Sequence, residues 1–278
     1  MNQVPRAKIF LEGRYRKLCR DLPQTVFFCP ECKGHPRRRR KCERCEGFGK
    51  LTRESVQELI GWVAGKAFGT RKNKFHGAGR EDVDVRMLGN GRPFVLELIA
   101  PKVFEVDLAA LEGEINQRND GRLEILGLHW TEKTRIAHLK ETPHAKEYEA
   151  LVSVDGAFDP KLWETIEPRI DVVQKTPQRV AHRRAAKDRT RWIELLGLEP
   201  AGAHQEGAAG MYRVRLRTQH GTYVKEVLSG EDGQTEPSLS TLLGVPCRCE
   251  ELDVLAILDE SGEEPHEPAA PPVFGAGL

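Results

Sequence analysis

Four of the seven cysteines form two Cys-x2-Cys pairs, and this spacing constrains the folding of the N-terminal region more than any other feature. The pairs are Cys29 with Cys32 and Cys42 with Cys45, separated by nine residues. Each pair can present two thiolates from a tight turn, and two such turns complete a tetrahedral shell around one ion. Paired disulfides are disfavoured in the cytosol, and a catalytic redox motif is not normally duplicated in this way. The spacing therefore predicts a structural zinc module over residues 26–50.

Charge is unevenly distributed along a chain whose net charge is only +1. Residues 13–50 carry 12 Lys or Arg against 4 Asp or Glu, and residues 171–191 carry 7 against 2. Basic clusters inside a neutral chain indicate local binding of an anion such as nucleic acid. The arginine run at 37–40, between the cysteine pairs, suits phosphate contacts. The alternative is that these basic runs are solvated surfaces.

A second informative segment is glycine-rich and has Asp82 near its centre. Two glycines precede this aspartate and two follow it within residues 75–94, which allows tight turns and close approach by another molecule. Residues 80–86 hold three carboxylates and two guanidiniums. A carboxylate beside arginines stays ionised and available as a nucleophile or base. The alternative is a solvated edge strand laced with salt bridges.

Hydrophobic spacing predicts an α+β fold, because the chain mixes helices and strands with long β connections. Thr52 or Ser55 is a candidate helix cap. The sequence predicts helices at residues 56–63, 107–116, 161–167 and 239–243, and strands at 93–100, 122–130, 148–154, 212–218 and 251–258.

The Gly-Arg-x-Asp run ending at Asp82, with the residues that follow it to Phe94, resembles the active-site segment of pseudouridine synthases. It is most similar to the archaeal and eukaryotic family that modifies two adjacent uridines in the T loop of tRNA. The resemblance extends from Gly13 to about Leu258. It implies a pseudouridine-synthase core, an extended mixed or antiparallel sheet flanked by helices, preceded here by the four-cysteine module. It also implies an enzyme that isomerises uridine, with Asp82 as its catalytic residue.

Three further residues acquire roles from this resemblance. Residues 146–150 resemble the Lys-x-Tyr motif, in which the aromatic ring, here Tyr148, stacks on the flipped base. Residues 221–225 resemble a Gly-Thr-Tyr motif followed by a basic residue, here Lys225, which pairs with the catalytic aspartate. Leu242 matches the apolar residue beneath the base pocket. By pattern alone, these are a packed strand residue, a surface lysine at a strand end and an ordinary apolar residue.

The resemblance also implies a tRNA partner that is bound through its T arm. Arg80 lies beside Asp82 as a substrate-binding residue, and a basic segment further on offers phosphate contacts. In that segment Arg179 and Arg183, four residues apart, share a helical face, and Arg184 flanks it. Zinc is expected to be structural, no organic cofactor is implied, and the sequence leaves protein partners unknown.

The sequence further predicts four regions. Residues 1–25 are a basic leader, the remnant of a THUMP-containing N-terminal RNA-binding domain that is largely missing. Residues 26–50 are the zinc module, 51–258 the catalytic domain, and 259–278 a disordered acidic, proline-rich tail. No apolar run reaches the roughly 20 residues of a membrane span, and no signal peptide is recognisable, so a cytoplasmic location is expected.

The main alternative is a catalytically inactive, zinc-dependent tRNA-binding protein or chaperone, and a zinc module for protein substrates ranks below it. The basic segments suit the tRNA-binding alternative equally well. Asp82 separates the two hypotheses, because a protein that only binds RNA has no use for an ionised carboxylate beside phosphates.

Overall fold

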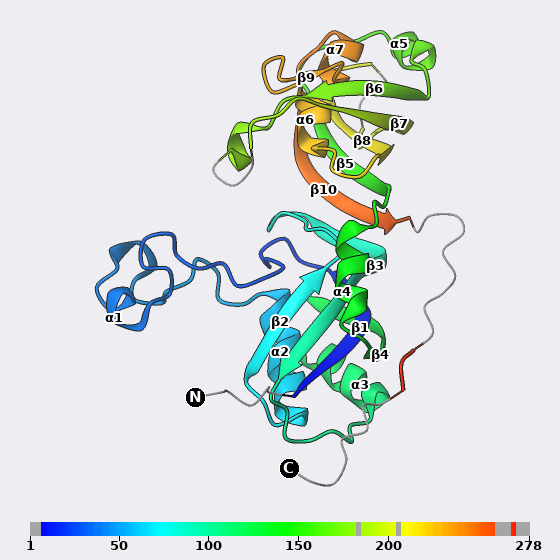
Figure 1. Ribbon diagram of the computed structural model, residues 1–278. Helices are drawn as coiled ribbons and strands as arrows, with labels where there is room; N and C mark the ends of the chain where they lie inside the picture. The colour runs from blue at the N-terminus through cyan, green and yellow to red at the C-terminus, as the bar shows by residue number, and fades with distance from the viewer. Residues whose placement is uncertain (1–6, 182–184, 204–206, 259–267, 271–278) are drawn as a thin grey trace. The chain divides into compact units, whose positions relative to one another are not determined.

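The computed structural model describes residues 7–181, 185–203, 207–258 and 268–270, and the chain divides into two compact units (Figure 1). The first unit consists of residues 1–142 with 264–278, and the second of residues 143–263. Each unit contains antiparallel strands with short helices packed on them, which confirms the predicted α+β fold.

The first unit contains four antiparallel strands in the order β4-β1-β3-β2. Strand β1 pairs with both β3 and β4, so a segment that the sequence placed in a basic leader is an inner strand. Its side chains alternate, with Leu11 and Tyr15 fully buried. The strands are β1 (Lys8–Lys17), β2 (Lys72–Gly77), β3 (Arg86–Ile99) and β4 (Leu123–Thr131).

Three helices pack on this sheet. They are α2 (Val56–Ala67), α3 (Leu108–Arg118) and α4 (Thr134–Glu141). The predicted cap at Ser55 is confirmed, because its hydroxyl accepts a hydrogen bond from the Glu58 amide. Helix α3 is fixed to β4 by Asn116, whose amide group bonds to the backbone N–H and C=O of Ile125. Helix α4 packs on β2 and β3.

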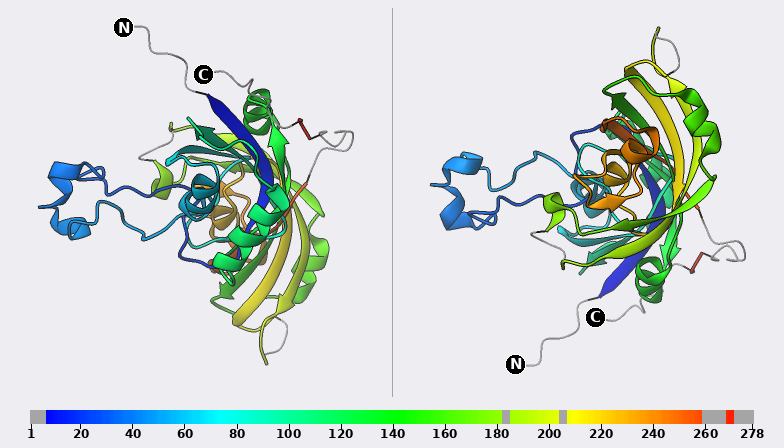
Figure 2. Two further views of the ribbon diagram at one scale, coloured as in Figure 1. Left: turned by 90° about the horizontal axis from the view of Figure 1, so that it is seen from below. Right: turned by 90° about the horizontal axis from the view of Figure 1, so that it is seen from above.

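The second unit contains six antiparallel strands in the order β10-β5-β8-β7-β6-β9, whose pronounced twist is visible in Figure 2. The strands predicted at 148–154, 212–218 and 251–258 are confirmed as β5, β8 and β10. Their bounds are β5 (Lys146–Val154), β6 (Arg169–Gln174), β7 (Arg189–Pro200), β8 (Gly210–Thr218), β9 (Thr235–Glu236) and β10 (Cys247–Ile257).

Short helices complete the second unit. Helix α6 packs on β10 and on α7, which begins with a capping box between Ser238 and Thr241. The elements are α5 (Pro160–Thr165), the 3-10 turn η2 (Gln178–Val180), α6 (Val224–Ser229) and α7 (Leu239–Leu243). Apart from residues 268–270, the predicted tail lies outside the described residues. Of the helices that the structure describes, none combines the length and apolarity needed to cross a membrane.

Glu97 of β3 is a buried carboxylate with basic neighbours. Its side chain is only 6% exposed, and it lies 2.7 Å from the Lys8 ammonium and 3.2 Å from Nε2 of His76. Burial raises the pKa of Glu97, but the hydrogen bonds from Lys8 and His76 outweigh burial and hold the pKa below its ordinary value.

A carboxylate whose pKa is lower in the folded than in the unfolded chain stabilises the fold above its unfolded pKa, about 4.3 for Glu. That contribution is lost as the pH falls through the folded pKa. We expect Glu97→Gln to lose less of its free energy of unfolding than wild type between about pH 6 and about pH 3. Urea unfolding at each pH measures this difference. Glu132→Gln, at an exposed carboxylate, should behave like wild type, and equal acid sensitivity in all three proteins would contradict the expectation.

Candidate active site and metal centre

Asp82 lies in a loop between β2 and β3, not in a strand, so the edge-strand alternative for this run is wrong. Asp82 is half-buried, whereas the preceding Glu81 is buried. The loop leaves β2 through a glycine turn, as the sequence predicted, and Gly79 adopts φ +79° there. A Cβ on Gly79 would lie 3.1 Å from Nη1 of Arg92, so the position is also crowded.

A buried ion pair holds this loop against the sheet. The Glu81 carboxylate accepts a hydrogen bond from Nε of Arg92 at 2.8 Å, and the two side chains are 1% and 2% exposed. The Tyr15 hydroxyl donates to the same carboxylate at 2.8 Å, and Nη1 of Arg92 donates to the carbonyl of Ala78 at 2.7 Å. Because each charge has charge-assisted partners, the pair is satisfied despite its burial.

Gln24 extends this cluster with two further hydrogen bonds. Its side-chain amide donates to the Tyr15 hydroxyl at 2.9 Å and to the carbonyl of Gly79 at 3.0 Å. Burial, followed by the charge of Glu81, raises the pKa of Tyr15 well above its usual value. Tyr15 therefore stays protonated and donates to Glu81.

Lys17 binds the backbone of the catalytic candidate itself. Its ammonium donates to the carbonyl oxygens of Leu22, Asp82 and Val83 at 2.8, 3.0 and 3.0 Å. The residue is fully buried, and this burial lowers its pKa. Three carbonyl dipoles replace the water that the ammonium loses, so the position of the Asp82 backbone depends on a buried cation.

Arg80 belongs to the first unit with Asp82 and is exposed. Within the described part of the chain, its guanidinium forms no ion pair or side-chain hydrogen bond, which leaves it available to a ligand. Tyr148 and Lys225 belong to the second unit. Tyr148 is buried on β5, paired with Leu216 of β8.

Lys225 is the second residue of helix α6, not a strand end, and it is half-buried. Leu242 on α7 is also half-buried, whereas the neighbouring Leu243 is buried. Arg179 lies in η2 and forms a two-pronged ion pair with Glu226 of α6, at 2.6 and 3.0 Å. This pair fixes η2 to α6, and phosphate binding by Arg179 stays a prediction.

Arg183 and Arg184 lie outside the described residues, so the helical face that Arg179 was expected to share with Arg183 stays untested. The sequence also missed the polar cluster around Glu81. It treated residues 13–17 as basic leader, although the alternation of Tyr15 and Lys17 was a signal that both point inward.

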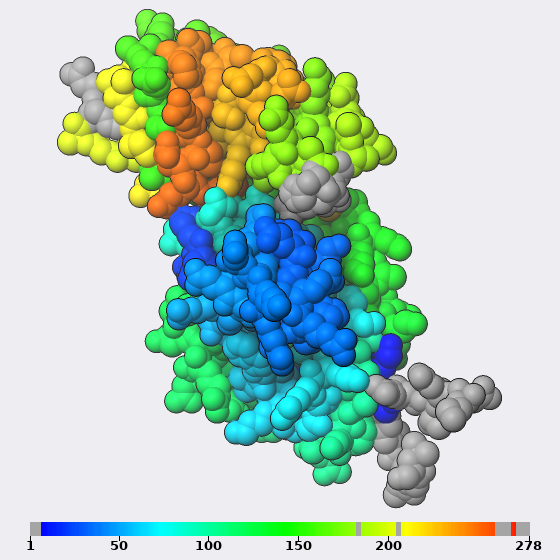
Figure 3. Space-filling view, turned by 90° about the vertical axis from the view of Figure 1, so that its left-hand side faces the viewer, coloured from blue at the N-terminus to red at the C-terminus, as the bar shows by residue number. Residues whose placement is uncertain are grey.

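The four paired cysteines converge on one point, as their spacing predicted. All four sulfurs lie within 4.8 Å of one another, and the Cys29–Cys42 and Cys32–Cys45 separations are both 3.7 Å. A tetrahedral ion with metal–sulfur bonds of about 2.3 Å requires sulfur separations of about 3.8 Å. All four cysteines are buried, within the N-terminal segment drawn in blue in Figure 3. The cluster can therefore hold a metal ion.

The two halves of the cluster have the same backbone geometry. After Cys32, Lys33 and Gly34 adopt φ values of 51° and 69°, and the two residues after Cys45 adopt 48° and 81°. Such turns aim two sulfurs and several amides inward, and the Gly49 amide donates to Sγ of Cys45 at 3.1 Å. The arginine run follows as the four-residue helix α1 (Pro36–Arg39), and a 3-10 turn η1 (Glu43–Cys45) leads into the second turn.

Breaking the buried ion pair should destabilise the fold strongly. Glu81→Gln leaves the Arg92 guanidinium buried without a counter-charge, and we expect a loss of about 3–5 kcal/mol in the free energy of unfolding, measured in urea. The matched control is Glu114→Gln, which breaks the exposed pair with Arg118 and should cost less than about 1 kcal/mol. Equal, small losses in the two variants would contradict the role of Glu81.

The chain is similar to proteins of one family. A curated "tRNA pseudouridine synthase Pus10" from Methanothermobacter marburgensis is 44% identical over 252 residues, which cover 90% of this chain and 60% of that relative. The protein of the same name from Methanopyrus kandleri is 42% identical over 260 residues, covering 92% and 57%. This chain thus spans less than two thirds of the length of these relatives.

Several solved structures are similar at low identity. A chain in "Crystal Structure of a Cbf5-Nop10-Gar1 Complex" is 19% identical, with a TM-score of 0.39 over 72% of this chain and 44% of its own length.

The family model described as "Pus10, C-terminal" matches residues 10–258, which include Asp82 and all four clustered cysteines. On that match, the chain belongs to the Pus10 family.

Proposed function

We propose that this protein is a tRNA pseudouridine synthase in which Asp82 is the catalytic residue. The observation that carries the proposal is the Asp82 loop, because buried charges hold its backbone through Lys17 and Glu81. Catalytic groups need such rigid support, and a loop that merely connects two strands does not. Membership of the Pus10 family and the names of the relatives agree with this chemistry.

The reaction needs no redox cofactor, because it only exchanges one bond for another. The bond between C1′ and N1 of uridine breaks, the uracil rotates, and C1′ bonds to C5. The proton on C5 is lost to solvent, and N1 gains a proton. In this scheme Asp82 acts on the nucleotide as nucleophile or base, in the role that the resemblance implies.

Other residues receive supporting roles in the proposal. Tyr148 would stack on the extruded base, and Leu242 would contribute the apolar floor of the base pocket. Lys225 would pair with the Asp82 carboxylate, with less fixed geometry than arginine provides. The exposed guanidinium of Arg80 would bind the substrate beside Asp82.

We propose the T arm of tRNA as the substrate region, with one or both of its adjacent uridines as targets. The motif resemblance supports this choice. Arg179, Arg183 and Arg184 would bind phosphates of the same RNA, and the exposed arginines 37–40 would add contacts from the four-cysteine module.

The metal that fits the cysteine cluster best is zinc. Burial raises the pKa of the Cys42 thiol to about 12, whereas the Cys32 amide lowers that of Cys29 to about 7. A bound cation is needed to hold all four sulfurs as thiolates, and four sulfur ligands favour Zn²⁺ and leave it no open position for catalysis. Thiols of this kind suit the reducing cytoplasm, which we propose as the location.

Tritium release from tRNA transcripts labelled at C5 of uridine tests the catalytic proposal. Wild type should release tritium, and Asp82→Ala should slow release by a factor on the order of 10³ or more. Asp84→Ala is the matched control, because it removes an exposed carboxylate from the same loop and should stay active. Absence of release by wild type, with tight RNA binding, would favour the inactive tRNA-binding alternative.

Metal analysis tests the zinc proposal. Purified protein should contain about one zinc per chain, and Cys32→Ser should lose most of it and unfold at lower temperature. Cys249→Ser, outside the cluster, should retain the metal. Full zinc content in Cys32→Ser, or another metal in wild type, would refute the assignment.

A further inference from the structure

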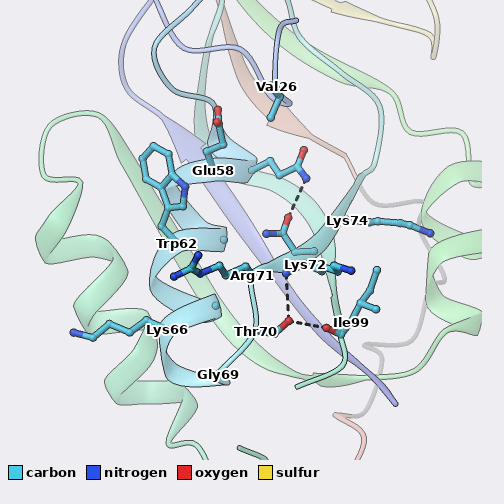
Figure 4. Close-up of a pocket in the computed structure, with 14 residues that line it drawn as sticks. Val26, Glu58, Trp62, Lys66, Gly69, Thr70, Arg71, Lys72, Lys74 and Ile99 are labelled. Atoms are coloured by element: carbon cyan, nitrogen blue, oxygen red, sulfur yellow. Dashed lines mark hydrogen bonds between the residues drawn. The ribbon is translucent and has the colours of Figure 1, made fainter. Parts of the chain in front are cut away.

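A groove lies between α2 and β2 in the first unit, apart from the residues assigned to catalysis (Figure 4). Its volume is about 930 Å³, which is at the upper end of the range for ligand-binding sites. Gly61 and Gly65 allow the helix to approach the following segment closely. A Cβ on Gly61 would lie 2.5 Å from Nδ2 of Asn73, and one on Gly65 would lie 2.5 Å from the carbonyl oxygen of Thr70.

Trp62 stands on the rim of this groove and is 55% exposed. It follows Gly61 on α2, and among the described residues its ring stacks on no other aromatic ring or cation. Large aromatic side chains are normally well buried, so an exposed indole beside a cavity indicates a contact surface.

The rim is also strongly basic. Lys66, Arg71 and Lys72 are exposed, and none of them forms an ion pair or side-chain hydrogen bond within the described residues. The one acid lining the groove, Glu58, is neutralised by Lys50 at 2.5 Å. Figure 4 shows Lys66, Arg71 and Trp62 projecting toward the same side of α2. Lys66 and Arg71 therefore place positive charge on the side of α2 where the indole face is available, whereas the Lys72 side chain points to the opposite side of β2, because the next residue, Asn73, faces α2.

We propose that this groove is a second RNA-binding site, which holds an unpaired nucleotide of the substrate away from the reacting uridine. The base stacks on Trp62, and Lys66 and Arg71 bind the flanking phosphates. Aromatic platforms beside cationic side chains are the usual means of binding single-stranded RNA. The identity of the RNA as substrate rests on the proposed function, whereas the groove's affinity for RNA does not.

A protein partner fits this surface less well. Strand β2 is an edge strand of the first unit, where it pairs with β3, and an edge can accept another strand. However, Lys72 and Lys74 are exposed along it, and lysines on an edge oppose such pairing. An acidic peptide would satisfy the cations but would leave the indole face without a planar partner.

The test measures the dissociation constant for an unmodified tRNA transcript by fluorescence anisotropy, over a series of salt concentrations. Trp62→Ala should bind roughly 10- to 100-fold more weakly, and Trp62→Phe, which keeps a ring, should bind nearly as well as wild type. Replacing Lys66 and Arg71 together by alanine should reduce the salt slope by roughly 1.5. The matched control replaces the exposed Lys133 and Lys161 by alanine and should leave the slope unchanged.

These outcomes are independent of catalysis, because tritium release is measured separately. Weaker binding by the groove variants supports the proposal whether or not wild type isomerises uridine. Unchanged affinity in Trp62→Ala and in the variant lacking Lys66 and Arg71 overturns it, even if wild type is active, and would favour a protein partner. All substituted side chains are exposed, and thermal unfolding of each variant verifies that the fold is retained.

Discussion

The ion pair between Glu81 and Arg92 is the interaction on which the candidate active site depends. Neither charge would be stable alone at 1–2% exposure, and each is satisfied only when β1, β3 and the Asp82 loop are assembled. Tyr15 and Lys17 reach the loop from β1, and Arg92 reaches it from β3. The loop conformation is therefore a consequence of sheet formation, not a local preference of its glycines.

Much of this molecule could be predicted from its sequence, and the failures have a common physical cause. Four cysteines at short spacing can meet in few ways, and helix α2 has both an apolar period and a cap. The sequence did not reveal which charged side chains point into the core. Residue type alone does not tell whether a lysine or glutamate, such as Lys17 or Glu81, is solvated or buried. The basic residues of β1 were therefore assigned to a leader and not to a strand. The charge pattern around Asp82 left an edge strand as an alternative, where the chain forms a supported loop.

Positive charge consequently serves two purposes in this chain. Arg92 and Lys17 are buried, fully partnered and structural. Exposed cations, among them Lys66 and the arginines 37–40, lie on surfaces suited to RNA. The two classes, structural and RNA-facing cations, differ in burial, and amino-acid composition does not distinguish them. Arg179 has partial exposure, and its ion pair with Glu226 fixes η2 to α6.

The most direct measurement of whether buried charge positions Asp82 is the single-turnover rate of Lys17→Met at saturating RNA. Methionine has similar length but cannot bind the carbonyls of Asp82 and Val83. We expect the rate to fall at least about 10-fold, as for a small misplacement of a catalytic group, while folded protein retains wild-type affinity for RNA. A wild-type rate in folded Lys17→Met would contradict the positioning role.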